Sequence, residues 1–255
     1  MAKAIFVTGG ASGIGLAAAK RFAAEGWRVG LADVNAAALG AVRGQIEGAS
    51  VYVMDVRDRA AWTRELTAFA GGDGIDVVFN NAGIASGGPF VDTPDDEIDR
   101  VVAINFMGVV NGARAAYPFL KQRPSACLLN TASAAGIYGT SGAAIYSATK
   151  FAVRGLTEAL DGEWRADGIK VRSLMPSFIE TPLLDASVTG SNQNVRQRVL
   201  AAGLELTPVD TVADAAWGAV HGDAVHTVVG KTARRLKFAA RWMPGSLRRQ
   251  MGRRF

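Results

Sequence analysis

The sequence predicts a single α/β domain built on a doubly wound parallel sheet of about seven strands, with helices on both faces. Short runs of β-branched and apolar residues alternate along the chain with longer segments of helical period, a pattern typical of βαβ units. A length of 255 residues and a hydrophobic fraction of 49% suit one domain with a sizeable core.

The expected strands are the short apolar runs, and the expected helices are the longer segments between them. The strands are Ala4–Thr8, Arg28–Ala32, Val51–Met54, Asp76–Asn80, Ala126–Thr131, Lys170–Met175 and Thr227–Val229. The helical segments include Ile14–Ala24, Arg59–Ala70, Asp95–Leu120 and Ser147–Trp164. We assign residues 1–230 to this domain. Within it, the irregular stretch 181–207 is expected to be a lid over a site, because so long an excursion in a compact domain is often functional.

Composition argues against several classes of protein. Cys127 is the single cysteine, so we expect no intrachain disulfide and a reducing, cytoplasmic location. With only His221 and His226 beside it, no metal site is expected. No apolar run approaches the length of a transmembrane helix, and the first residues lead straight into a strand, so neither a membrane span nor a secretory signal is expected.

The net charge of +5 is distributed unevenly. Residues 231–255 contain nine Lys or Arg and no acidic residue, which leaves 19 basic and 23 acidic residues in the rest of the chain. The body is therefore mildly acidic, and the charge alone does not indicate a nucleic-acid partner. No nucleic-acid recognition motif accompanies the basic extension, so we expect no such partner.

The basic extension at 231–255 has a helical apolar pattern. Its apolar positions are Leu236, Ala239, Ala240 and Met243, flanked by Phe238 and Trp242, and after Pro244-Gly245 a spacing of four recurs at Leu247, Met251 and Phe255. A basic amphipathic segment with Trp and Phe can lie on an anionic membrane surface. It can equally fold over a neighbouring subunit or the substrate entrance, or stay disordered, and the sequence leaves these alternatives open.

A glycine-rich turn follows the first expected strand and opens a helix. It has the sequence Thr8-Gly9-Gly10-Ala11-Ser12-Gly13-Ile14-Gly15. Glycines at 9, 13 and 15 allow a sharp turn and close approach of the backbone to a pyrophosphate, and the helix N-terminus supplies free N–H groups and a positive dipole end. The alternative is a tight turn with close helix packing. Asp33, at the end of the second strand, favours the first interpretation.

A carboxylate at Asp33 accepts hydrogen bonds from an adenosine ribose and repels a 2′-phosphate. The neighbouring Ser12 and Val34 supply no cation that would hold that phosphate. The sequence therefore predicts NAD as the cofactor, preferred over NADP.

These features resemble the short-chain dehydrogenase/reductase family, whose motifs recur here in order from residue 3 to about 230. The glycine turn matches TGxxxGxG, and Asp55-Val56 resembles the family's adenine-contacting pair. Asn80-Asn81-Ala82-Gly83 matches NNAG, and Tyr146 with Lys150 forms YxxxK, 13 residues after Ser133. The resemblance implies a Rossmann-type fold, an oxidoreductase, and a homotetramer or homodimer.

The resemblance also implies residue roles. Asn105, Ser133, Tyr146 and Lys150 would be catalytic, with Ser133 bonding the substrate oxygen, Lys150 binding the nicotinamide ribose, and Asn105 kinking its helix to hold a water. The implied cofactor-binding residues are Gly9, Ser12, Gly13, Ile14, Gly15, Asp33, Asp55, Val56, Asn81, Ala82, Gly83, Tyr146, Lys150, Pro176, Ile179 and Thr181. One departure is Ser177, where the family has glycine, and a positive φ there would cost about 1 kcal/mol.

Tyr146 and Lys150 lie four residues apart, so on a helix they share one face. A tyrosine with an ordinary pKa of about 10 is a poor base near neutrality, and lowering that pKa to about 7 needs about 4 kcal/mol in favour of phenolate. A cation at about 4 Å supplies a gross attraction of that size in an effective dielectric of about 20. Lys150 is placed to be that cation, although desolvation opposes the effect.

The predicted activity is hydride transfer between NAD and a secondary alcohol. Ser133, Tyr146 and the lid residues Leu183 and Leu184 are expected to bind the substrate, and the apolar lid favours an apolar or aromatic alcohol, steroid-like ones included. The alternatives are a biosynthetic carbonyl or 3-oxoacyl reductase, and a membrane-tethered NAD-binding module without catalysis. A Ser-His-Asp hydrolase is disfavoured because both histidines lie near the last strand and no G-x-S-x-G motif exists.

Overall fold

A computed structural model describes residues 2–251 and contains one parallel seven-stranded sheet in the order β3-β2-β1-β4-β5-β6-β7. The strands are β1 Ala4–Thr8, β2 Arg28–Asp33, β3 Ser50–Val53, β4 Val77–Asn80, β5 Cys127–Thr131, β6 Lys170–Pro176 and β7 His226–Val229. Every pair of neighbouring strands is parallel. The predicted doubly wound α/β architecture is confirmed, and each expected strand lies within two residues of the observed one.

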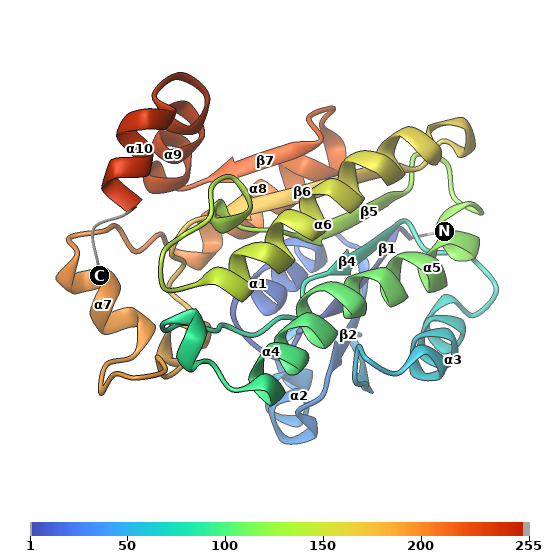
Figure 1. Ribbon diagram of the computed structural model, residues 1–255. Helices are drawn as coiled ribbons and strands as arrows, with labels where there is room; N and C mark the ends of the chain where they lie inside the picture. The colour runs from blue at the N-terminus through green and yellow to red at the C-terminus, as the bar shows by residue number, and fades with distance from the viewer. Residues whose placement is uncertain (1, 252–255) are drawn as a thin grey trace.

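Helices cover both faces of the sheet (Figure 1). They are α1 Gly13–Ala23, α2 Ala36–Val42, α3 Arg59–Ala70, α4 Asp95–Val102, α5 Gly108–Leu120, α6 Ala144–Glu163, α7 Val195–Ala201, α8 Val209–His221, α9 Lys231–Trp242 and α10 Pro244–Met251. The face under α1, α2 and α8 has one apolar core, and the face under α3, α5 and α6 has another. Each described helix is too short or too polar to cross a bilayer.

The strand side chains explain why both faces need a helical cover. In β1, Ile5 and Val7 belong to the core beneath α1 and α8, whereas Ala4 and Phe6 belong to the core beneath α3 and α5. All five residues of β1 are buried. Such continuous apolar runs are typical of parallel strands that are covered on both sides.

The strand order reverses between β1 and β4, which are neighbours in the sheet although β2 and β3 lie between them in the chain. The carboxyl ends of β1 and β4 therefore diverge into connections on opposite faces. In open α/β sheets this crevice is where ligands bind. The glycine turn follows β1 and Asn81-Ala82-Gly83 follows β4, so both motifs flank it.

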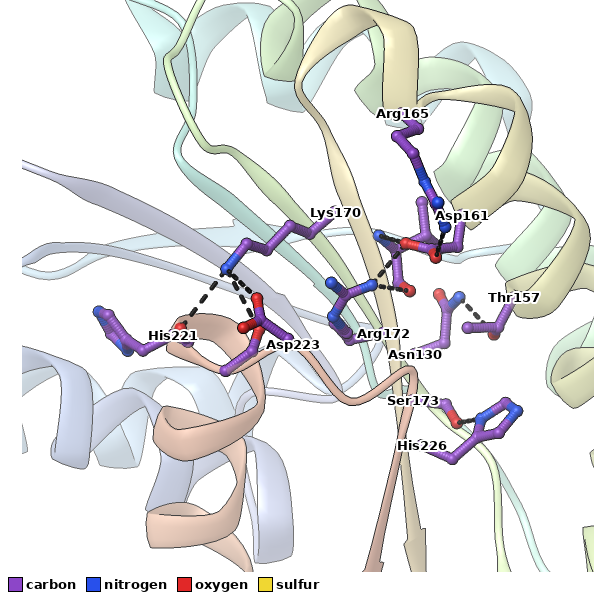
Figure 2. Close-up of polar contacts among 12 residues, drawn as sticks. Asn130, Thr157, Asp161, Arg165, Lys170, Arg172, Ser173, His221, Asp223 and His226 are labelled. Atoms are coloured by element: carbon purple, nitrogen blue, oxygen red, sulfur yellow. Dashed lines mark hydrogen bonds and ion pairs between the residues drawn. The ribbon is translucent and has the colours of Figure 1, made fainter.

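A buried ion pair fastens α6 to β6 (Figure 2). Asp161 on α6 accepts hydrogen bonds from the guanidinium of Arg172 and from the backbone N–H of Val171, the latter at 3.2 Å. Arg172 is only 6% exposed. Because α6 also carries Tyr146 and Lys150, this ion pair stabilises the helix that presents the expected catalytic pair.

Candidate active site

The glycine turn is shaped by contacts that exclude side chains. Gly9 and Gly13 have φ of 63° and 51°, a region that favours glycine. A Cβ on Gly15 would lie 2.2 Å from the carbonyl oxygen of Gly9. The turn therefore requires glycine at these positions, and it brings the first turn of α1 beneath the carboxyl end of β1.

The N-terminus of α1 is free to receive an anion. Its N-cap Ser12 makes no side-chain capping hydrogen bond, and the first turn has no acidic residue. The N–H groups at a helix start need acceptors, and the helix dipole favours a negative charge there. The residues therefore fit the pyrophosphate of a nicotinamide dinucleotide, with Gly13, Ile14 and Gly15 supplying the backbone.

A hydrogen-bonded network joins the carboxyl ends of β1, β4 and β5. The Thr8 hydroxyl accepts from the backbone N–H groups of Asn81 and Ala82, at 3.1 and 3.2 Å. The Asn81 amide donates to the Thr8 carbonyl, at 3.0 Å, and accepts from the Thr131 hydroxyl, at 3.1 Å. This network fixes the loop that contains Gly83 beside the glycine turn. Sequence reasoning did not identify Thr8 and Thr131 as positioning residues.

Asp33 ends β2 beside the glycine turn. Its carboxylate accepts from the backbone N–H groups of Ala11, at 3.2 Å, and Asn35, at 3.0 Å. Asp55 is bound by Arg57, whose Nη2 lies 2.6 Å from Oδ2, and this hydrogen bond lowers the pKa of Asp55. Val56 is buried. The cation Arg57 is thus already paired with the carboxylate of Asp55.

Ser133, Tyr146 and Lys150 meet at the carboxyl end of β5. Ser133, whose oxygen accepts from the N–H of Ala135 at 3.1 Å, lies near enough to the Tyr146 hydroxyl to favour its phenolate. Lys150 Nζ donates to the Thr131 carbonyl at 2.9 Å and lies 5.5 Å from the centroid of the Tyr146 ring. The pair predicted from spacing alone therefore shares one face of α6, beside a serine from β5.

Burial dominates the acidities of this pair. Desolvation raises the pKa of Tyr146, an effect that the hydrogen bond to Ser133 only partly offsets. Desolvation also lowers the pKa of Lys150 to about 8. At the observed 5.5 Å separation from the ring, an ammonium gives a gross attraction of about 3 kcal/mol in an effective dielectric of about 20. Burial therefore leaves the Tyr146 phenol with a raised pKa in the protein without cofactor.

A family model of short chain dehydrogenases matches residues 3–192. The chain belongs to the short-chain dehydrogenase family. A 3-alpha-(or 20-beta)-hydroxysteroid dehydrogenase of Mycobacterium bovis is 36% identical over 185 residues, 72% of this chain and 71% of that protein. A meso-2,3-butanediol dehydrogenase of Serratia marcescens is 35% identical over 217 residues, 83% of this chain and 84% of that protein.

A solved structure gives the same result for the whole fold. A short chain dehydrogenase/reductase from Burkholderia phymatum, in complex with NAD, matches with a TM-score of 0.84 at 25% identity, covering 100% of this chain and 97% of that chain. The predicted family, its α/β fold and an oxidoreductase activity are therefore confirmed for this dehydrogenase.

Asn105 lies in a π-helical turn, Ala103–Met107, that separates α4 from α5. Apolar periodicity predicted a helical segment over Asp95–Leu120, and the family resemblance implied a kink at Asn105; the π-helical turn lies at that place. The fully buried Asn105 amide donates to the Ile84 carbonyl at 2.9 Å and accepts from the Ile84 N–H at 2.8 Å. Single π turns inside helices are frequent at functional sites. Asn105 thereby connects the helix to the loop after Gly83.

The segment after β6 returns the chain to the glycine turn. A Cβ on Gly13 would lie 3.2 Å from Cγ2 of Thr181, while Pro176 and Ile179 are buried. Ser177 is absent from the positive-φ residues of the described chain, so the strain expected from its Cβ does not arise. Its hydroxyl is buried without a hydrogen-bond partner, close to the equally unpartnered Thr207 hydroxyl across Gly230.

The expected lid packs onto the loop after β4. Thr189 N–H donates to the Gly87 carbonyl at 2.9 Å, and Val188 is buried. Leu184 is buried as well, whereas Leu183 is 39% exposed. Of the two leucines expected at the substrate, Leu183 therefore keeps the more accessible side chain.

Arg196 on α7 holds the first residues of the lid, a role that no sequence motif predicted. Its guanidinium bonds Glu180 at 2.8 Å and Asp185 at 2.9 Å, and it donates to the Thr181 carbonyl at 3.2 Å.

We predict that Arg196→Gln raises the KM for NAD about three- to tenfold with little change in kcat, because a loosened Thr181 weakens ground-state binding. Steady-state kinetics test this. Arg198→Gln, on the same helix, is the control, and an equal effect in both variants would contradict the role.

Both histidines are engaged in contacts with residues outside the candidate site, and Figure 2 shows the bond between His226 and Ser173. His226 Nδ1 is 2.8 Å from the Ser173 hydroxyl, and its Nε2 is 2.8 Å from Glu158. This is a serine–histidine–acid chain, but Ser173 is 0% exposed and no substrate reaches it. His221 bonds the Trp217 carbonyl and packs on its ring. These contacts agree with the structural role expected for the two histidines.

Proposed function

We propose that this dehydrogenase transfers hydride between NAD and an apolar secondary alcohol, with Tyr146 as the general base in oxidation and the general acid in reduction. The observation that carries the proposal is the convergence at one strand end: Ser133 follows β5, and the carbonyl of Thr131, two residues before it, accepts a hydrogen bond from Lys150, whose Nζ lies 5.5 Å from the centroid of the Tyr146 ring. All three side chains come from the edge of the sheet that also carries the glycine turn.

In the proposed mechanism Ser133 and Tyr146 hold the substrate oxygen between their hydroxyl groups. A dinucleotide bound at the glycine turn would supply a hydride acceptor for the carbinol carbon and a positive charge beside Tyr146. Tyr146 takes the hydroxyl proton as the carbonyl forms. Lys150 stabilises the phenolate by its charge, and Asn105 keeps the neighbouring Gly83 loop in place. A Cβ on Gly83 would lie 3.2 Å from Asn105 Oδ1 and 3.7 Å from Lys150 Nζ.

The substrate class is inferred from the residues that follow Ser133 and form the wall beside it. This wall consists of the buried Ala134, Ala135 and Gly136 and the partly exposed Ile137 and Tyr138. These side chains offer few hydrogen-bonding groups, so we infer an apolar or aromatic alcohol. The hydroxysteroid relative fits this class, whereas the butanediol relative is named for a small polar diol. A screen of secondary alcohols, followed by the absorbance of reduced nicotinamide, tests the inference, and preference for polyols or acyl thioesters would contradict it.

Cofactor choice is predicted from Asp33. We expect kcat/KM with NAD to exceed that with NADP on the order of 100-fold, because the carboxylate bonds a ribose and repels a phosphate. Asp33→Ala should reduce this ratio about tenfold or more, mainly by impairing NAD use. Arg57, the cation two residues beyond Asp55, is engaged by that carboxylate. Equal turnover of both cofactors by the wild type would overturn the assignment.

We also propose self-association as a dimer or tetramer. The outer face of α6 presents an exposed stripe of small and apolar residues, Ala148, Phe151, Gly155 and Ala159. Phe151 is 41% exposed. Close helix packing between copies would cover this stripe. Sedimentation velocity tests it, with Phe151→Glu expected to shift the protein toward monomer.

A further inference from the structure

The basic extension forms α9 and α10, which lie side by side beyond the carboxyl end of β7 (Figure 1). Their inner face belongs to the body of the protein. Ala233 and Leu247 are 0% and 3% exposed, and α9 packs against β7 and the short turn Ala134–Gly136. Of the apolar stripe predicted from sequence, Leu247 is buried, Leu236, Ala239 and Ala240 are half-buried, and Met243 is exposed. The extension is therefore attached to its own chain, next to the residues that follow Ser133, by only part of that stripe.

The outer face keeps its large apolar side chains in solvent. Phe238, Trp242 and Met243 are 60%, 65% and 50% exposed. Phe238 and Trp242 are one helical turn apart on α9, so they lie on one face. Met243 adjoins them at the break before α10. Three large apolar side chains so exposed and so close together mark an interaction surface.

This apolar patch is surrounded by positive charge. The exposed cations of the two helices are Lys231, Arg234, Arg235, Lys237, Arg241, Arg248 and Arg249. None of them forms an ion pair within residues 2–251, and the extension has no acidic residue. Arg253, Arg254 and Phe255, which continue the pattern, lie outside the described residues. We call Phe238, Trp242, Met243 and the seven cations the tail surface.

We propose that the tail surface binds the headgroup region of an anionic lipid bilayer. Exposed Trp and Phe among cations suit an interface that is anionic at the surface and apolar beneath it. The seven cations, with no acidic residue in the extension, complement an extended anionic surface rather than a few matched carboxylates. The docking holds the carboxyl edge of the sheet near the membrane. If the proposed function is right, it also places the wall beside Ser133 near alcohols dissolved in the bilayer.

Vesicle co-sedimentation of the full-length protein tests the proposal without any assay of activity. The probes are vesicles of phosphatidylcholine alone and vesicles containing about 30% phosphatidylglycerol. We expect binding to the anionic vesicles, release as salt is raised to about 0.5 M, and no binding to the neutral vesicles. Equal binding to both vesicles, or binding to neither, would overturn the proposal.

Variants assign the binding to the tail surface. Neutralising Arg234, Arg235 and Arg241 to glutamine should lower the partition coefficient on the order of 100-fold at low salt. Phe238→Ser with Trp242→Ser should lower it about tenfold. Both sets leave Leu247 and the inner face intact, and unchanged thermal unfolding verifies that.

The matched control neutralises three exposed cations of the body, Arg43, Arg100 and Arg114, and should change the partition coefficient less than about twofold. An equal loss in the control would show nonspecific attraction and refute the surface. Sedimentation velocity without lipid tests whether a second copy of the chain binds the tail surface instead. If self-association depends on the tail cations and the protein does not bind anionic vesicles, the proposal is wrong.

Discussion

Replacing Tyr146 by phenylalanine is expected to abolish turnover, lowering kcat about 1,000-fold or more, while NAD binding stays within about twofold. The ring keeps its packing, so the change removes only the hydroxyl group beside Ser133. Without it, the substrate proton has no acceptor, whereas the glycine turn and Asp33 that would hold the cofactor are untouched. Steady-state kinetics and NAD titration by intrinsic fluorescence measure the two effects separately.

Tyr52→Phe provides the matched control, since Tyr52 is a half-buried tyrosine on β3, at the other end of the strand order from β5 and β6. It should retain most of the wild-type kcat. A Tyr146→Phe variant that keeps a tenth of the wild-type rate would contradict the assignment. Loss of NAD binding together with turnover would instead indicate damage to the fold.

The pH dependence of the wild type follows from the same residue. In alcohol oxidation Tyr146 must accept a proton, so the rate should rise with pH as the phenol ionises. In ketone reduction Tyr146 must donate one, so the rate should fall over the same range. Burial raises the pKa of Tyr146 in the free protein. A bound cationic cofactor favours the phenolate, so with it the rise in the oxidation rate should occur at lower pH. A pH profile of oxidation that falls through this range would contradict the role of base.

The strands were predictable from sequence because covering both faces of a parallel sheet makes most strand residues apolar, as with Ala4, Ile5, Phe6 and Val7 of β1. Apolar periodicity did not predict the π turn at Ala103–Met107, and only the family resemblance implied a kink at Asn105. A π turn adds one residue without changing the composition of the helix, and Asn105 is held there by the backbone of Ile84, 21 positions away. The same reasoning applies to Ser177, whose dihedral angle depends on the path of the chain between β6 and β7.

The candidate site was predictable where spacing alone sets geometry, as with Tyr146 and Lys150 on one helical face. Its energetics were not. The sign of the Tyr146 pKa shift depends on how deeply the fold buries the phenol, and the position of Lys150 depends on the Thr131 carbonyl. Arg196 was missed for a similar reason, since its partners Glu180 and Asp185 come close only when the lid folds.

The second large effect is expected at the ion pair beneath the catalytic helix. Asp161→Asn should lower the free energy of unfolding by about 3–5 kcal/mol, because removing one partner leaves the buried Arg172 charge uncompensated. Chemical denaturation measures this. Arg165→Gln is the control: Arg165 approaches the same carboxylate at 3.3 Å but its side chain is 78% exposed, so its loss should cost less than about 1 kcal/mol. Equal losses in both variants would contradict the argument.

The pH dependence of that effect has a definite sign. Burial raises the pKa of Asp161, but hydrogen bonds from Val171 and Arg172 outweigh it, so the pKa lies below its ordinary value. A carboxylate with a lowered pKa stabilises the fold fully above its unfolded-state pKa of about 4, and this stabilisation is lost as the pH falls through the lower folded pKa. The wild type should therefore keep its whole advantage over Asp161→Asn at neutral pH and lose it in acid. Replacing both partners, Asp161→Leu with Arg172→Met, should recover much of the stability, because the cost comes from an unpaired buried charge. If the double variant is as unstable as Asp161→Asn, the geometry of the pair rather than its charge fastens α6 to β6.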